Sequence, residues 1–183
     1  MAESESVSFH ITFPAKVEAP LTLTWEFDSF GADTSFLKHY FAIEGFVCAY
    51  EYDYWDVFWQ SEVSKSAYEM HGRDHTRLKM TKDKWDRPVI DVSSNPGRQT
   101  LVKDLWIMAG PRMYLGPIYC NLVCSKERLL QFKGAVELEN NVIFIELLNG
   151  TKIGDTDALK KLRVEQQRFL DFIDLVNTIT KLS

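Results

Sequence analysis

The sequence predicts an α+β fold, in which a mostly antiparallel β-sheet is packed by a mid-chain helix and a long C-terminal helix. Several short stretches alternate apolar and polar residues, as half-buried strands do. These strands outnumber the helices that could cross between parallel neighbours, which favours antiparallel pairing. The final stretch carries a single apolar helical stripe. The 183 residues suit one domain, 1–183, and we expect the polar residues 1–6 to be a disordered tail.

Two strands are expected near the N-terminus, at residues 7–13 and 21–27, where apolar residues recur at every second position. Asp33 is then placed to cap a helix over residues 34–44, since its carboxylate can accept hydrogen bonds from the first turn. Gly45 is expected to end this helix in the left-handed conformation. This segment is the predicted mid-chain helix.

Residues 46–60 are the most β-prone stretch, and we predict one continuous strand there. A period of two divides the side chains of this strand between two faces. One face holds Tyr50, Tyr52, Tyr54 and Phe58. The other face holds Glu51, Asp53, Trp55, Val57 and Trp59.

The middle and the end of the chain are expected to add short strands, turns and helices. In the middle we expect a strand or short helix at 64–70, a strand at 88–93, a turn at 94–97, a strand or buried segment at 100–108 and a strand at 118–123. Next we expect a helix capped by Ser125 that runs to about Phe132, and a hairpin of 135–139 and 142–148. The last element is a long helix over 155–181, which Asp155 or Asp157 caps.

Two Gly-Pro pairs, at 110–111 and 116–117, bracket residues 112–115. Because proline fixes φ and lacks a backbone donor, each pair predicts a turn or a sheet edge. The enclosed segment is therefore expected to be a rigid loop that carries Arg112 and Tyr114, two residue types enriched at interfaces. A structural turn inserted into the core is an equally good interpretation.

Composition bounds the class of protein. No stretch approaches ~18 uninterrupted apolar residues, so we expect no membrane span. Cys48, Cys120 and Cys124 are an odd number without a disulfide spacing, which favours a reducing compartment. The N-terminus has no basic segment followed by an apolar run, so it does not read as a secretory signal. Cytoplasmic localisation is the expectation.

The net charge of −5 disfavours nucleic-acid binding, but charge is unevenly distributed along the chain. Residues 1–62 contain 2 basic and 11 acidic residues, a net charge of −9. Residues 63–134 have a net charge of +6, and residues 135–183 a net charge of −2. Unless folding interleaves these segments, the first of them forms an acidic face that attracts a basic partner.

The acidic and aromatic residues between Glu51 and Trp59 admit three interpretations. A surface of this composition suits recognition of a basic protein. Paired carboxylates beside indole rings also suit glycoside hydrolysis or sugar binding, which would rely on Glu51 or Asp53 with Trp55 and Trp59. The third interpretation is a half-buried strand with tyrosines in the core and acids in solvent.

Other motifs that could indicate a metal site, a cofactor or a catalytic group are weak. His71 and His75 have helical metal-ligand spacing, but Gly72 disfavours a helix there and no third ligand is nearby in sequence. Cys120 and Cys124 lack a second ligand pair and are expected to be buried small hydrophobic residues. No phosphate loop, dinucleotide fingerprint or nucleophile elbow occurs. We therefore expect no metal and no cofactor, and a binding protein is favoured over an enzyme.

The predicted function is that of a non-enzymatic protein that binds, and neutralises or regulates, a protein partner with a basic surface. In overall profile, rather than in any motif, the chain resembles small acidic bacterial immunity proteins, which implies inhibition of a toxin. The residues predicted to contact the partner are Glu51, Asp53, Trp55, Asp56, Trp59, Arg112 and Tyr114. The alternatives are a small enzyme or carbohydrate-binding domain, and a subunit of a homo-oligomer or larger assembly that docks through the terminal helix.

Overall fold

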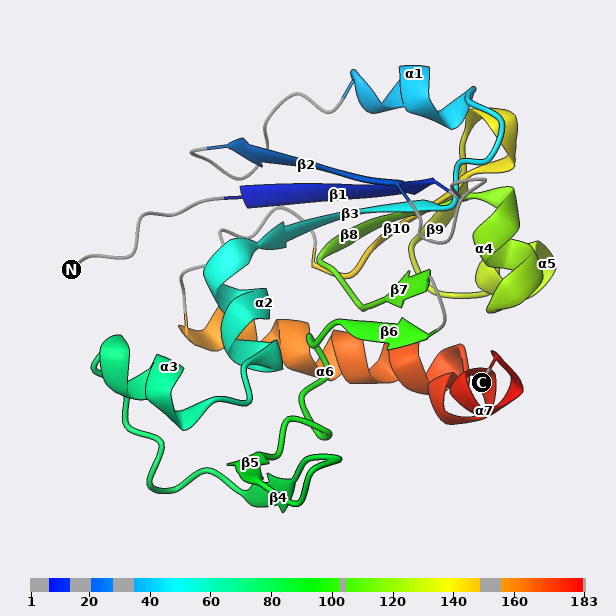
Figure 1. Cartoon of the computed structure of the whole chain (residues 1–183). Coiled ribbons are helices and arrows are strands. Elements are labelled where there is room, and N and C mark those ends of the chain that lie inside the picture. Colours follow the sequence, from blue (N-terminus) through cyan, green and yellow to red (C-terminus); the bar gives the residue numbers. More distant parts are fainter. Residues whose placement is uncertain (1–6, 14–20, 28–34, 103–104, 149–155, 183) are drawn as a thin grey trace.

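The computed structural model describes residues 7–13, 21–27, 35–102, 105–148 and 156–182 (Figure 1). Its main feature is a six-stranded sheet with the order β2-β1-β3-β8-β10-β9. Every pairing between these strands is antiparallel, which confirms the predicted mostly antiparallel sheet. The strands are β1 (Val7–Phe13), β2 (Leu21–Phe27), β3 (Cys48–Asp53), β8 (Arg112–Leu115), β9 (Ala135–Glu137) and β10 (Ile143–Glu146).

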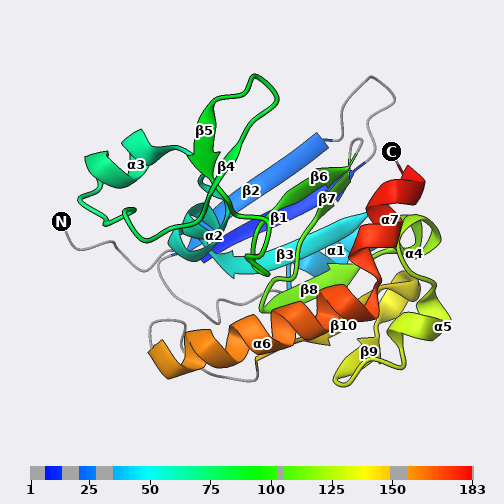
Figure 2. The same cartoon turned by 90° about the horizontal axis from the view of Figure 1, so that it is seen from below.

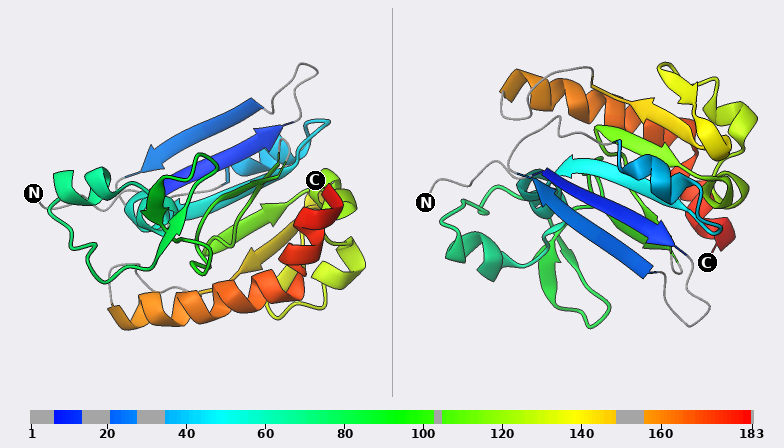
Figure 3. Two further views of the ribbon diagram at one scale, coloured as in Figure 1. Left: turned by 60° about the horizontal axis from the view of Figure 1, so that its bottom comes forward. Right: turned by 90° about the horizontal axis from the view of Figure 1, so that it is seen from above.

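Helices cover both faces of the sheet, as Figures 1 and 3 show. Helix α1 (Leu37–Phe41) lies over one face, and α6 (Thr156–Phe172) crosses the other. The hairpin of β6 (Thr100–Val102) and β7 (Leu105–Ile107) lies on the α6 side. Seen from below, α6 runs along β8 and β10 (Figure 2). The predicted α+β class with a long C-terminal helix is thus confirmed.

The C-terminal helix is interrupted, whereas a continuous helix to residue 181 was expected. Helix α6 ends at Phe172, and α7 (Leu175–Leu182) follows it. Between them Asp174 adopts φ 53°, a left-handed conformation that a continuing α-helix does not contain. Of the two expected caps, Asp157 lies in the first turn of α6, and Asp155 lies outside the described residues.

Alternation along β3 divides the core into two parts. Cys48, Tyr50 and Tyr52 belong to the larger core on the α6 side, whereas Ala49 belongs to the smaller core beneath α1. The predicted period of two is therefore correct over residues 48–53. The expected burial of Cys120 and Cys124 is confirmed, and Cys48 is also a buried free thiol.

Helix α1 is shorter than the helix expected over residues 34–44. It spans five residues, and its Leu37 and Phe41 are buried in the smaller core. Gly45 adopts the expected positive φ, 96°, but it does not end the helix, because α1 ends at Phe41 with Ala42 as its C-cap. The predicted cap, Asp33, lies outside the described residues.

Residues 62–91 form a lobe beside the sheet, which we call the α3–β4–β5 lobe (Figures 1 and 2). Its elements are α3 (Lys65–Met70), β4 (Met80–Lys82) and β5 (Pro88–Ile90). Two backbone hydrogen bonds close the lobe near its base. Ile90 donates to the carbonyl of Val63 at 2.9 Å, and Asp91 donates to the carbonyl of Lys79 at 2.8 Å. The helix alternative for residues 64–70 is thus correct.

The strand expected at residues 118–123 was wrong, since α4 (Pro117–Leu122) occupies this segment. Pro117 stands in the first turn, where its fixed φ and missing N–H favour the start of a helix. The next helix, α5 (Lys126–Leu129), is capped as predicted, because Ser125 Oγ accepts a hydrogen bond from the Arg128 N–H at 3.3 Å. The expected hairpin is present as β9 and β10.

Residues 112–115 form the central strand β8, so the predicted rigid loop was wrong. This strand pairs with β3 on one side and β10 on the other. The flanking prolines lie at its ends, where a missing backbone donor does not interrupt the ladder. Gly116 follows the strand in tight surroundings, because a Cβ added there would lie 2.5 Å from the carbonyl oxygen of Phe46.

Gly116→Ala should therefore destabilise the fold by about 2 kcal/mol or more, since the clash is with the backbone carbonyls of Phe46 and Val47, directly before β3. Urea unfolding measures this change. Asn121→Ala, on the exposed side of α4, is the control and should change stability by less than about 0.5 kcal/mol. Equal midpoints for the two variants would contradict the assigned packing around Gly116.

Candidate functional site

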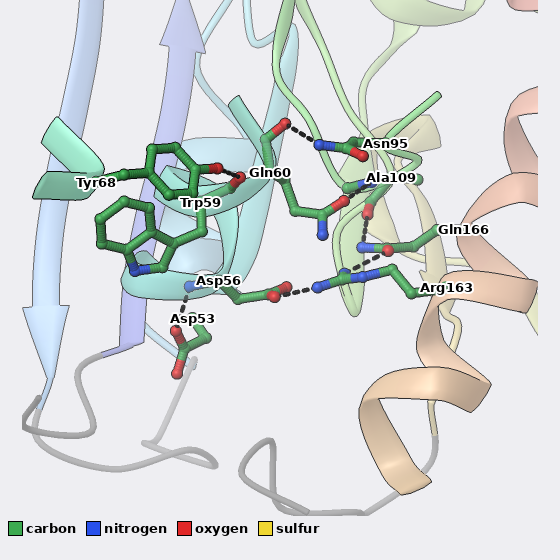
Figure 4. Close-up of polar contacts among 10 residues, drawn as sticks. Asp53, Asp56, Trp59, Gln60, Tyr68, Asn95, Ala109, Arg163 and Gln166 are labelled. Carbon is green, nitrogen blue, oxygen red and sulfur yellow. Dashed lines mark hydrogen bonds and ion pairs between the residues drawn. The ribbon is translucent and has the colours of Figure 1, made fainter. Parts of the chain in front are cut away.

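Helix α2 (Tyr54–Ser61) begins where the strand expected over residues 46–60 should have continued. Asp53 has an extended backbone, and its carboxylate accepts a hydrogen bond from the Asp56 N–H at 2.7 Å (Figure 4). This is an N-cap interaction, which stabilises the first helical turn. The prediction of one continuous strand was wrong from Tyr54 onward, because capping outweighs the β-propensity of the aromatic residues.

The helical period brings Trp55 and Trp59 together on one side of α2. Their rings are nearly parallel, at 19°, with centroids 6.4 Å apart. The His71 ring contacts both indoles edge-on, at 5.4 and 5.3 Å. The guanidinium of Arg73 lies 4.3 Å from the Trp59 ring, a cation–π distance. The indoles are thus partly covered by the segment that follows α3.

A second side of α2 is polar and faces α6. Asp56 forms an ion pair with Arg163, as Figure 4 shows. Arg163 also donates to the side-chain oxygen of Gln166 at 2.8 Å, and the buried Gln166 donates to the carbonyl of Ala109 at 2.7 Å. Asp56 is therefore engaged inside the molecule and fixes α2 against α6.

The C-terminal end of α2 is also hydrogen-bonded to residues 95–99, the segment that follows the lobe. Asn95 donates to the carbonyl of Gln60 at 3.1 Å, and the Gly97 N–H donates to the Gln60 side chain at 3.1 Å. Ser61 Oγ accepts a hydrogen bond from the Gln99 N–H at 3.1 Å. These contacts hold the C-terminal end of α2 in place, so the helix presents its remaining side chains from a fixed position.

A third side of α2 lines a pocket of about 280 Å³, which we call the α2 pocket. Tyr54 and Phe58 stack with ring centroids 6.1 Å apart and an interplanar angle of 24°. The other lining residues are Tyr52, Val57, Ser61, Glu62 and Gln99. The pocket combines aromatic walls with a carboxylate.

Glu51 and Arg112 are paired across the sheet and do not form a surface with α2. Glu51 is 0% exposed, and its Oε2 lies 3.3 Å from Nη1 of Arg112 on the neighbouring strand. Arg112 also donates to Glu146 at 2.8 Å. Burial by itself would lower the pKa of Arg112, but the hydrogen bond to Glu146 and the charges of both carboxylates outweigh it and raise that pKa.

Arg112→Met should destabilise the fold by about 3 kcal/mol or more, because it removes the guanidinium that pairs with the buried Glu51 carboxylate. The double variant Glu51→Leu with Arg112→Met should recover most of this loss, since it removes both charges. Urea denaturation of the two variants tests the coupling. A double variant as unstable as Arg112→Met would refute it.

Asp53→Ala should lower stability by about 1 kcal/mol, because the first turn of α2 loses its side-chain acceptor. Asp53→Ser is the matched control, since its hydroxyl can still cap the helix and should cost only a few tenths of a kcal/mol. Chemical denaturation of both variants measures the difference. If alanine and serine prove equivalent, the capping role assigned to Asp53 does not hold.

The seven predicted partner-binding residues lie in three places. Asp53, Trp55, Asp56 and Trp59 belong to α2 or its cap. Glu51 and Arg112 form the internal pair. Tyr114 packs in the smaller core, 5.4 Å from the Phe41 ring and 5.0 Å from the Phe144 ring, and is buried. The structure therefore does not bring the seven residues together on one surface.

The sequence interpretation missed Tyr54, Phe58 and Glu62 as a group. Tyr54 and Phe58 are four residues apart, and Glu62 is four residues further on. This is the spacing of neighbours on one side of a helix, so the signal was present. This helical spacing was not recognised because residues 54, 58 and 62 also fall on one face of a strand, where the side-chain period is two.

The arrangement does not supply the accessible carboxylate pair that glycoside hydrolysis requires. Glu51 has no exposed surface, and Asp53 is occupied as the cap of α2. Among the described residues there is no group of three or more potential His, Cys, Asp or Glu metal ligands. Burial raises the pKa of the Cys120 thiol to about 11, which disfavours the thiolate that binds metals. None of the described helices is long and apolar enough to cross a membrane.

Comparisons of the chain with protein-family models, with curated proteins and with solved structures find no match.

Proposed function

We propose that this chain is a non-enzymatic protein-binding protein, of the kind of a small bacterial immunity or inhibitor protein, and that it contacts its partner through α2 and the α3–β4–β5 lobe. The observation that carries the proposal is the concentration of exposed large apolar side chains in this region. They are Tyr54, Val63, Met70, Leu78, Met80 and Trp85. Exposed apolar surface of this kind marks interaction sites in globular proteins.

The most exposed members are Met70 at 79% and Trp85 at 64%. Two cations lie at cation–π distance from Trp85, with Lys84 Nζ 4.2 Å and the Arg87 guanidinium 4.6 Å from its ring centroid. Asp83 fixes the turn, because its carboxylate accepts hydrogen bonds from the Trp85 and Arg87 N–H groups at 2.8 and 2.9 Å. Tryptophan presented from a fixed turn suits a binding hot spot, since little ordering remains to be lost.

The partner we propose has a basic surface, which fewer acidic residues support than the sequence alone implied. Glu51 and Asp56 are engaged by internal arginines, so they do not support this part of the proposal. Residues 62–91 contain 7 basic and 6 acidic residues, so the lobe itself is nearly balanced. The charge preference is supported instead by Glu62 in the α2 pocket.

We propose that the protein acts in the cytoplasm, which its three buried free thiols support. Docking of copies through the terminal helix has less support than the lobe, because α6 buries Ala158, Leu162 and Phe169 within this chain.

The test is affinity capture from an extract of the source cells, with retained proteins identified by mass spectrometry and rebound in purified form. Wild type should retain a specific partner, and the Met70→Asp/Trp85→Asp variant should bind it at least about tenfold more weakly, because the apolar contacts are lost. The matched control is Leu130→Asp/Val136→Asp, which changes exposed apolar residues beside α5 and in β9, away from the lobe (Figure 1).

The control variant should bind like wild type, with circular dichroism confirming that both variants are folded. Undiminished binding by the lobe variant, equal loss in the control variant, or the absence of any partner that binds in purified form would each contradict the proposal.

A further inference from the structure

We propose that the α2 pocket binds a guanidinium group, the side chain of an arginine of the partner protein. This inference rests on the proposed protein-binding function and names the chemical group that one part of the surface recognises. Binding of a guanidinium requires aromatic walls for stacking, a carboxylate without a cationic partner, and a fixed geometry. Each of these is present in the described residues.

The walls of the pocket suit a flat cation. Tyr54 and Phe58 stand four residues apart on α2 with nearly parallel rings, and Tyr52 and Val57, both buried, line the pocket with them. A guanidinium is planar and weakly hydrated, so it stacks on aromatic faces at a smaller desolvation cost than an ammonium group. The apolar walls also accommodate the methylene groups of an arginine side chain.

The charge of the pocket selects a cation. Glu62, the residue directly after α2, contributes its carboxylate. One oxygen of this group, Oε1, accepts a hydrogen bond from the Ser64 N–H at 2.6 Å, which fixes its orientation. Within the described parts of the chain, no cationic side chain pairs with Glu62, and none lines the pocket. An incoming guanidinium would supply the missing charge through Oε2.

The other polar groups that line the pocket are consistent with the same ligand. Ser61 and Gln99 line the pocket, and their mutual hydrogen bond holds the backbone of Gln99 beside α2. The side-chain oxygen of Gln99 is an acceptor, and a guanidinium has five N–H donors to satisfy. A neutral or anionic ligand would leave the Glu62 charge uncompensated.

The size of the pocket matches one side chain. At about 280 Å³ it lies just below the range of about 300 to 1,000 Å³ typical of sites for small molecules and cofactors. Tyr54 belongs both to the pocket and to the exposed apolar surface, so the two are continuous. Because α2 is fixed by Asp56 and Gln60, little reorganisation is needed when the ligand enters.

The experiment uses the full chain and a tripeptide probe, acetyl-Gly-Arg-Gly-amide, followed by NMR. We expect saturable shifts of the Gln99 side-chain amide and of the backbone amides of residues 62–64. The same peptide with citrulline, which has the shape of arginine without the charge, should bind roughly threefold to fivefold more weakly, as expected for a partly exposed ion pair. The lysine peptide should also bind more weakly, since it cannot stack.

Glu62→Gln should reduce the affinity for the arginine peptide to that for the citrulline peptide. Glu69→Gln is the matched control, because Glu69 is an exposed glutamate of α3 that does not line the pocket, and it should leave the affinity unchanged. Absence of saturation, equal affinities for arginine and citrulline, or an unaffected Glu62→Gln variant would overturn the inference.

The outcomes for the pocket and for the proposed function are separable. If the arginine peptide fails to bind while the Met70→Asp/Trp85→Asp variant still loses the partner, only the pocket assignment is wrong. If the peptide binds as expected but no partner is captured, the pocket stands and the binding surface of the lobe does not.

Discussion

One hydrogen bond at the end of β3 determines how this molecule presents its aromatic side chains. The Asp53 carboxylate accepts a hydrogen bond from the Asp56 N–H, and the chain changes at this point from strand β3 to helix α2. The side-chain period changes there from 2 to about 3.6 residues. As a consequence, Tyr54 and Phe58 stack on one side of α2 and line a pocket together with Tyr52, the penultimate residue of β3. The pocket, the paired indoles and the polar contacts with α6 all follow from this change of direction.

Periodic patterns made the regular parts of the fold predictable, and competing local signals explain the failures. Residues 7–13 and 21–27 alternate without interruption, and the structure has strands there. Residues 118–123 are a short apolar run, which periodicity alone cannot assign to a strand or a helix. The decisive signal was Pro117 at the first helical position, which the sequence interpretation used only as a sign of a turn or a sheet edge.

The candidate surface was less predictable, because it depends on pairings between residues far apart in the chain. Glu51 and Arg112 are separated by 61 positions, and Asp56 and Arg163 by 107. No local pattern indicates that these arginines remove two of the predicted acidic contacts from solvent. The sequence interpretation placed the candidate site around α2, but only tertiary structure distinguishes the engaged carboxylates of Glu51 and Asp56 from that of Glu62.

The position of β8 beside β3 has a consequence for how this protein can diversify. The chain leaves the sheet after Asp53 and re-enters it at Arg112, on the adjacent strand. Residues 54–111 connect these two strands, and the pairing of β3 with β8 already holds the two ends of this segment together. The entropy of closing such a loop rises only slowly with its length. The loops of the lobe can therefore be lengthened or shortened at a small entropic cost to the sheet.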